Sequence, residues 1–330
     1  MGRYALTLVV FQILSGCQKD PQVGPVDPTV KNTANLSGRR LVIGNEGNFQ
    51  YNNSSITVYS LETGEVTQEV YRSANGEGVG DVLQDMVAFD GKVLVSVNNS
   101  GKVLILNDSS WSEEGRIEGL NSPRRLYNQD PSTLWVTDLY GNEVTRIDLS
   151  EEKVTGKLEF DGWSEGITQI DEEVWIANMT DSSLNRYDLG ISERNLYIQL
   201  DFEPRFIDTT QFHVYVAGNA AGTGYLTAWL SSWVYPASLS ESVSGMDGFR
   251  GWSYVLTPHR VEIYDIDLNR IGGFDHLASS PYSIYVNKDG VFIADVKDFI
   301  TRGEVLFYNH QYELVDRIPA GYVPQCMLAL

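Results

Sequence analysis

From residue 39 onward, short apolar runs alternate with turns rich in Gly, Asn, Asp and Ser. The runs are four to eight residues long and rich in β-branched and aromatic side chains, which predicts β-strands. The turn residues between them predict tight reversals of the chain, and no stretch between the runs has the period of an amphipathic helix. The two clearest copies of this pattern have runs at 123–127, 134–138, 144–149 and 154–158, and then at 165–167, 174–178, 184–189 and 195–200.

Four strands that recur roughly every forty residues are typical of the blades of a β-propeller. We therefore predict an all-β, seven-bladed β-propeller. Six blades are predicted directly, at 83–119, 123–160, 164–200, 204–242, 247–275 and 281–319.

The seventh blade is predicted from the two ends of the repeating region. Residues 40–71 hold three strands, and residues 324–330 have the phase of an innermost strand. Pairing the N- and C-terminal strands would close the ring and leave no open sheet edge between the first and last blades. The unit at 247–275 is short, so a six-bladed ring is the alternative count.

The first residues of the chain predict export and lipid attachment. An apolar run from Tyr4 to Leu14 is too short for a bilayer, which takes about 20 helical residues, but suits a signal peptide. The sequence Leu14-Ser15-Gly16-Cys17 matches the lipobox of bacterial lipoproteins. We predict a signal peptide at 1–16, a lipidated flexible tether at 17–38 and the propeller at 39–330, with Cys17 as the lipidation site.

The residues after Cys17 bear on the location of the protein. Gln18-Lys19-Asp20 resembles the short signal that sends some lipoproteins to the outer face of the outer membrane. We expect an outer-membrane protein anchored by lipid and exposed at the cell surface, with the periplasmic leaflet as the alternative. The second cysteine, Cys326, lies in an apolar run and is predicted to be a buried core residue rather than a partner of Cys17.

The charge of the chain restricts its partners. The formal net charge is −20, with 44 acidic and 24 basic side chains. A surface with this much negative charge repels nucleic-acid phosphates and anionic lipid headgroups. We therefore expect no nucleic-acid partner and no membrane contact apart from the lipid anchor.

The phase of the repeat predicts a site at one end of the propeller, where loops present side chains around the central channel. At the start of the innermost strands we expect Gln84, Arg124, Glu165, Arg205, Tyr282 and Gln325. At the ends of the second strands we expect Asn45, Asn98, Asp138, Asn178, Gly218 and Asp295. Aromatic side chains fall in or beside the same connections, namely Tyr140, Trp163, Phe49, Tyr51 and Phe299.

The residue types in this ring suit ligand binding. Arginine presents a planar fork to carboxylates or amides, glutamine and asparagine match amide groups, and aromatic rings beside polar groups favour recognition. The alternative is structural, because Arg124, Glu165 and Arg205 would also lock adjacent blades by pairing with one another. The sequence favours neither role.

Several segments of the chain also carry a family resemblance. The segments 45–49 and 80–86, the turn 97–100 and the step Ser122-Pro123-Arg124 resemble YncE-like propeller lipoproteins of the outer membrane. The resemblance implies a seven-bladed fold and capture of a small ligand, such as cobalamin or an iron-siderophore, for a TonB-dependent transporter. It implies no ligand identity, because the matching motifs belong to the frame.

Other chemistry is weakly represented in the sequence. The four histidines, His213, His259, His276 and His310, have no metal-ligand spacing, so we predict neither a metal nor a cofactor. The carboxylates Glu46, Asp81, Asp85 and Glu165 would allow acid/base work on glycans, though carboxylates are common in this chain. The leading hypothesis is therefore a capture protein rather than an enzyme. The alternatives are a protein-interaction scaffold with an inert channel and a carbohydrate-active enzyme.

Overall fold

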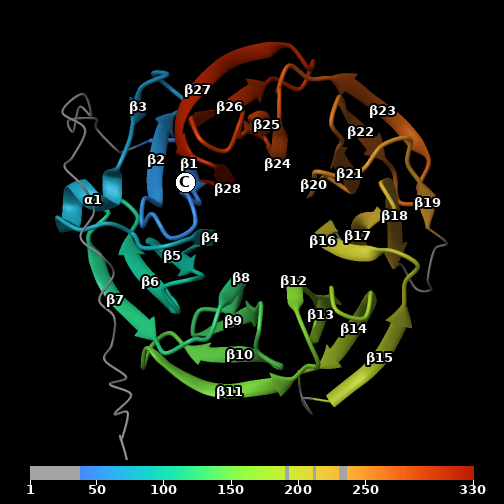
Figure 1. Ribbon diagram of the computed structural model, residues 1–330, viewed down its shortest axis with the longest axis horizontal. Helices are drawn as coiled ribbons and strands as arrows, with labels where there is room; N and C mark the ends of the chain where they lie inside the picture. Colours follow the sequence, from blue (N-terminus) through green and yellow to red (C-terminus); the bar gives the residue numbers. More distant parts are fainter. Residues whose placement is uncertain (1–37, 190–192, 211–212, 230–235) are drawn as a thin grey trace, which may run out of the picture.

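The computed structural model describes residues 38–189, 193–210, 213–229 and 236–330. Within these ranges the chain forms seven four-stranded sheets arranged as blades around a central axis (Figure 1). The seven-bladed propeller predicted from the repeat is confirmed, because each predicted unit forms one blade.

We number the blades along the chain and give the strands of each from innermost to outermost. Blade 1 is β28 (Pro324–Ala329), β1 (Arg40–Asn45), β2 (Ser55–Ser60) and β3 (Val66–Thr67); blade 2 is β4 (Leu83–Phe89), β5 (Lys92–Val97), β6 (Lys102–Asn107) and β7 (Glu113–Glu118). Blade 3 is β8 (Pro123–Asp130), β9 (Thr133–Asp138), β10 (Glu143–Asp148) and β11 (Lys153–Glu159); blade 4 is β12 (Ser164–Ile170), β13 (Glu173–Asn178), β14 (Ser183–Asp188) and β15 (Glu193–Gln199). Blade 5 is β16 (Glu203–Thr210), β17 (His213–Ala220), β18 (Thr223–Trp229) and β19 (Ala237–Ser238); blade 6 is β20 (Gly245–Phe249), β21 (Trp252–Leu256), β22 (Arg260–Tyr264) and β23 (Arg270–Asp275). Blade 7 is β24 (Pro281–Asn287), β25 (Gly290–Asp295), β26 (Arg302–Tyr308) and β27 (Leu314–Tyr322).

Blade 1 closes the ring by joining the two ends of the described chain. Strand β28 pairs antiparallel with β1, from Leu41 opposite Ala329 to Asn45 opposite Pro324. The backbones of Arg40 and Leu330 exchange two further hydrogen bonds, each 2.9 Å long. The predicted closure is therefore confirmed.

The alternative count of six blades is excluded by blade 6. Its strands are short, but all four are present and paired in order, from β20 to β23. The sequence marks its innermost strand poorly because β20 reads Gly-Met-Asp-Gly-Phe, in which two glycines and an aspartate dilute the apolar pattern.

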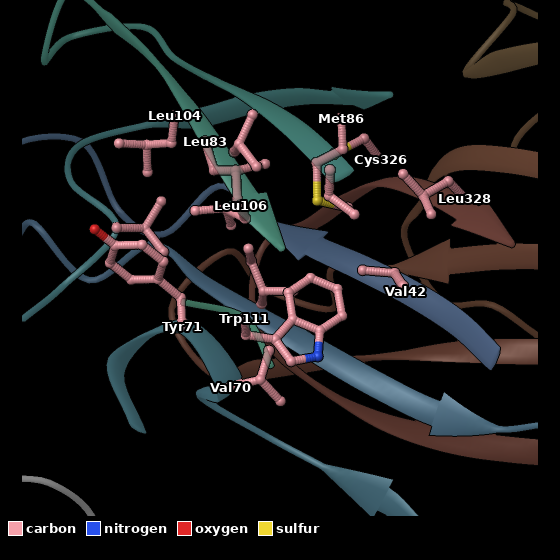
Figure 2. Packing of buried hydrophobic residues seen from close by; sticks show 14 of the residues in the cluster. Val42, Val70, Tyr71, Leu83, Met86, Leu104, Leu106, Trp111, Cys326 and Leu328 are labelled. Atoms are coloured by element: carbon pink, nitrogen blue, oxygen red, sulfur yellow. The ribbon is translucent and has the colours of Figure 1, made fainter. Parts of the chain in front are cut away.

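The hydrophobic core lies between neighbouring sheets. Between blades 1 and 2, Val42, Leu83, Met86, Cys326 and Leu328 pack together, all at most 8% exposed (Figure 2). The burial predicted for Cys326 is confirmed by this contact set. Each core cluster joins strands of two adjacent blades, so neighbouring blades stabilise one another.

The sequence pattern does not predict the helix α1 (Val70–Asn75), which links blade 1 to blade 2. The helix ends at Gly76, whose φ of 75° is a conformation that glycine adopts without steric cost. Val70 and Tyr71 anchor it by packing in the same core cluster as Trp111 (Figure 2). With six residues and two buried positions, α1 is too short to leave a periodic signal.

The predicted signal peptide, Cys17 and nearly all of the predicted tether lie in residues 1–37, outside the described residues. Across the described ranges, no helix has both the length and the apolar character needed to cross a bilayer.

Close packing at the closure generates a stability prediction. A Cβ on Gly44 would lie 2.5 Å from Sγ of Cys326 and 2.7 Å from Cδ2 of Leu83. We expect Gly44→Ala to lower the free energy of unfolding by about 2 kcal/mol, because overpacking forces neighbours out of place. Urea denaturation measures this change.

The matched control is Gly156→Ala in the outer strand β11, where a Cβ would meet only Arg146, at 3.8 Å or more. We expect it to change the free energy of unfolding by less than about 0.5 kcal/mol. Equal effects of the two substitutions would contradict close packing between β1, β4 and β28.

Candidate functional site

Six of the seven innermost strands carry a β-bulge close to their first residue. The register between innermost and second strand shifts in blades 1, 2, 3, 4, 5 and 7, whereas β20 of blade 6 pairs without a shift. The residues within these bulges are Gln325, Gln84, Arg124 with Arg125, Glu165 with Gly166, Arg205 and Tyr282. A bulge bends the strand and re-aims a side chain.

All six residues predicted for the innermost strands therefore occupy equivalent, irregular positions. They lie at the end of the propeller where innermost strands begin and second strands finish, which we call the mouth. The phase of the sequence repeat identified these positions as equivalent, but it did not predict the bulge that orients their side chains.

Hydroxyl groups of neighbouring strands hold three of the bulges. Ser96 donates to the carbonyl of Arg124 at 2.6 Å, and Thr137 donates to the carbonyl of Glu165 at 3.3 Å. Ser283 donates in the same way to the carbonyl of Gln325. Each bond runs from one blade to the next, so the backbone of the mouth is fixed by contacts between blades.

Arg124 and Glu165 form an ion pair between blades 3 and 4. The Nε and Nη2 atoms of Arg124 bind the two carboxylate oxygens of Glu165 at 3.0 and 2.7 Å. Trp163 donates its indole N–H to the same carboxylate at 2.6 Å, and the guanidinium of Arg124 lies 5.5 Å from the centre of the Trp163 ring. This pairing matches the structural alternative set out above.

The environment of Glu165 keeps it ionised. Burial alone would raise its pKa, but the charges of Arg124 and Arg125, with hydrogen bonds from Arg124 and Trp163, outweigh burial and lower it. A carboxylate held in this way is a permanent negative charge at neutral pH.

Glu46 is at the centre of a second polar group, contributed by blades 1, 2 and 7. Gln84 donates to its Oε1 at 2.8 Å, and the hydroxyl of Tyr282 lies 3.3 and 3.4 Å from its two oxygens. Gln84 also lies 3.4 Å from Oε1 of Gln325. Burial raises the pKa of Glu46 to about 7, although Gln84, Arg124, Arg125 and Tyr282 act in the opposite direction.

The ligand-binding set predicted from the sequence omits Arg125, and it omits Glu46, which the sequence offered only as a carboxylate for acid/base work. Arg125 shares the bulge of Arg124; it donates to the carbonyl of Gln84 at 3.1 Å and lies 3.6 Å from Glu165. Repeat phase points to one residue per innermost strand, so it missed the second residue of this bulge. Glu46 directly follows the end of β1, and its position beside Asn45 was the available signal.

Arg205 does not join either group. Its side chain is 48% exposed, and it pairs with Glu203 two residues earlier on the same strand at 3.2 Å. The sequence placed Arg205 at the same position as Arg124, and the structure agrees, but no contact joins Arg205 to Glu165 among the residues described.

The residues at the ends of the second strands bind backbone groups of their own blade or a neighbouring blade. Asp138 accepts from the N–H groups of Ser122 and Tyr140, and Asp295 from those of Ser279 and Ser280. Asn45 accepts from Gly321, Asn98 donates to Pro123, and Asn178 donates to Asp161. These side chains stabilise the loops of the mouth, so we leave them outside the group of direct ligand contacts.

Large apolar side chains gather around the mouth. Phe49, Tyr51, Tyr140, Leu277, Phe299 and Ile300 all lie in connections at this end, and each is between 49% and 77% exposed. Loops from blades 1 and 7 are joined where Asn48 donates to the carbonyl of Phe299 at 2.7 Å. The ring of Phe299 in turn meets Tyr282 edge-on at 5.6 Å. Trp163, by contrast, is partly buried against Arg124.

A pair of aspartates lies further along the channel wall. Asp208 of β16 accepts the N–H of Gly248 at 2.6 Å, and Asp247 of β20 accepts that of Val286. Burial raises the pKa of both, and the proximity of Asp208 raises that of Asp247 further. In the described part of the chain, no group of three or more His, Cys, Asp or Glu is arranged to hold a metal ion.

Comparison with known proteins agrees with this architecture. Residues 40–183, which span three strands of blade 1, blades 2 and 3 and part of blade 4, match a family model described as a domain of unknown function, DUF5074. No curated protein matches the chain.

Solved structures resemble the whole propeller. A putative 6-phosphogluconolactonase from Bacteroides fragilis has a TM-score of 0.67 and 10% identity, covering 91% of this chain and 100% of that one. The periplasmic gluconolactonase of Pseudomonas aeruginosa has a TM-score of 0.68 and 8% identity, covering 89% and 99%. A functionally unknown protein from Desulfotomaculum acetoxidans has a TM-score of 0.69 and 12% identity, covering 89% and 99%.

The chain is a seven-bladed β-propeller. At such low identities the likeness to these structures establishes the shared fold, and one propeller frame hosts many activities.

The contrast between the two predicted arginines is testable by stability. Arg124→Ala would leave Glu165 buried without its bidentate partner, so we expect a loss of roughly 3 kcal/mol in the free energy of unfolding. Arg205→Ala removes only an exposed pair and is expected to cost less than about 1 kcal/mol. Chemical denaturation of both variants measures the free energy of unfolding, and equal losses would contradict the pairing of Arg124 with Glu165.

The aspartate pair generates a pH prediction. A carboxyl whose pKa is raised by folding favours the folded state at low pH, and this contribution is lost as pH rises through the folded pKa. Asp247→Asn retains an acceptor for Val286 and removes a charge, so we expect about 1 kcal/mol more stability near pH 8 and little gain near pH 5.

Thermal unfolding at several pH values measures the effect. Asp90→Asn is the control, because Asp90 lies exposed in the turn between β4 and β5. A uniform shift in stability of Asp247→Asn across the pH range would argue against a raised pKa of Asp247.

Proposed function

We propose that the protein is a ligand-binding propeller, attached by lipid at Cys17 to the outer membrane and exposed at the cell surface. In this proposal the mouth captures a small molecule, such as a corrinoid or an iron-siderophore, and presents it to a TonB-dependent transporter. The family resemblance supplies the ligand classes and the transporter, and the lipobox supplies the anchor.

The distribution of exposed apolar side chains carries the proposal. Of twelve in the described residues, six lie in connections at the mouth and five lie in outermost strands, whereas Trp252, in the hairpin of blade 6, lies at the opposite end. Exposed apolar side chains beside polar groups are typical of binding surfaces. The mouth has such groups beside two polar clusters built from five blades or their loops.

The direction in which the chain enters the propeller supports the same orientation. Strand β1 runs from Arg40, at the end opposite the mouth, to Asn45 at the mouth. An anchor that precedes Arg40 would therefore join the propeller on its far side. The mouth would then be free to receive a ligand from the medium.

Binding accounts for the mouth better than acid/base catalysis does. Glu165, which the sequence offers as a general acid or base, is paired with Arg124 and Trp163, and its pKa is lowered. A general acid requires a raised pKa and access to substrate. Glu46 has the raised pKa but is bound to Gln84 and Tyr282.

Isothermal titration calorimetry with corrinoids, ferric siderophores and oligosaccharides tests capture. We expect saturable binding in at least one class, with a one-to-one stoichiometry. No heat with any of the three would contradict capture, and association with membrane proteins in the absence of small ligands would then favour the scaffold alternative.

Variants of the rim locate the binding surface for whichever compound binds. We expect Phe299→Ala and Tyr140→Ala to weaken affinity by about 1 to 2 kcal/mol each, because each removes an exposed contact without disturbing the core. Trp252→Ala, at the opposite end, is the matched control and should bind like the unaltered protein. If only Trp252→Ala weakened binding, the ligand would bind at the end opposite the mouth, which would contradict the proposal.

A further inference from the structure

Two guanidinium groups at the mouth retain donor capacity. Arg124 uses Nε and Nη2 for Glu165, and Arg125 uses Nη1 for the carbonyl of Gln84. For Nη1 of Arg124, no hydrogen-bond partner is found within the described ranges, and Nη2 of Arg125 lies 3.6 Å from Glu165. The side chains are 16% and 24% exposed, so both remain in contact with solvent.

The charges around these donors change with protonation. Glu165 carries a permanent negative charge, which balances one of the two arginines. The remaining acidic groups are Glu46 and Asp85, and burial favours the neutral form of each. A proton on Glu46 removes one negative charge from beside the two arginines, so their remaining donors become better able to bind another anion.

We propose that the mouth binds an acidic group of its ligand, a carboxylate or a similar planar oxyanion, on Arg124 and Arg125, and that Glu46 takes up a proton from solution as this group binds. The inference rests on the proposed binding function and identifies the chemistry that the site recognises. The bound anion takes the place of the Glu46 charge opposite the arginines, and one proton enters when the ligand binds a molecule in which Glu46 was ionised.

The arrangement around Glu46 suits this exchange. Gln84 and Tyr282 bind Glu46, and the charges of Arg124 and Arg125 act on it, as Glu46 acts on the thiol of Cys326. Asp85 and Glu165 act on the same Arg125, and Gln325 accepts a hydrogen bond from Gln84. Gln84 and Tyr282 offer hydrogen bonds to either form of the carboxyl, so Glu46 can gain a proton without losing its place. The pKa of Glu46, raised by burial to about 7, supports uptake near neutral pH.

Exposed rings at the same end determine the choice of probe. Phe299 and Tyr140 offer exposed apolar surface at the mouth, the same end as the two arginines. An aromatic acid would therefore contact the rings through its own ring and the arginines through its carboxylate. Benzoate is the probe, and benzamide, of the same shape but neutral, is its matched control.

The experiment is calorimetric titration of the full chain with each probe, in pairs of buffers that differ in ionisation enthalpy. We expect benzoate to bind with uptake of about half a proton at pH 7, rising toward one proton near pH 8, and to bind at least about tenfold more weakly at pH 8.5 than at pH 6. Benzamide should bind at least about tenfold more weakly than benzoate at pH 6.

Two variants separate recognition from folding. Glu46→Gln keeps an acceptor for Gln84 and should bind benzoate with the same affinity at both pH values and without proton uptake. Arg125→Lys keeps the charge and loses the planar fork, so we expect about tenfold weaker binding with an unchanged circular dichroism spectrum.

Equal affinity for benzamide and benzoate, pH-independent binding by the unaltered protein, or no benzoate binding at millimolar concentration would each overturn the inference. A neutral corrinoid that still binds at the mouth would leave the proposed function standing while this inference fails. If no compound binds measurably, both the proposed function and this inference are contradicted.

Discussion

The pairing of β28 with β1 is the constraint on which the rest of the structure depends. A propeller blade buries its two faces against its neighbours, so an open ring would expose the faces of the first and last blades to water. Here one sheet combines three strands from the start of the described chain with one from its end, and the core cluster around Cys326 continues from blade 1 into blade 2. Closure therefore sets the distance between all innermost strands, and with it the width of the mouth.

Contacts between innermost strands repeat around the ring at the spacing of the blades. Asp85, Asp208 and Asp247 each accept a backbone N–H from the next blade, at Leu126, Gly248 and Val286. Each innermost strand pairs on one side only, and these carboxyls bind N–H groups of such strands, which is why partly buried acids are tolerated in the channel wall. Burial opposes the ionisation of these carboxyls, so their pKa values lie above the usual range.

The mouth combines rigidity with chemical variety. Bulges direct long polar side chains to the same end of the ring, hydroxyls of neighbouring blades fix the bulged carbonyls, and the second-strand residues Asp138 and Asp295 hold the loops. Structural locking and ligand binding are compatible in one residue: Arg124 uses two nitrogens to join blades 3 and 4 and retains a third. A site whose frame is fixed before the ligand arrives loses less entropy on binding.

The sequence by itself determined the blades, the closure and the equivalence of the bulge residues, because these follow from strand periodicity and repeat phase, which are local properties. It also identified Cys326 as core from its apolar neighbours. It did not determine that Arg205 is separate from Glu165, that Asn45 and Asp138 bind backbone groups, or that Glu46 and Arg125 belong to the mouth. Those outcomes depend on which side chains meet across blades some forty residues apart, and on bulges that re-aim them. Repeat phase specifies a position on the ring, whereas the partner at that position is decided only when the ring closes.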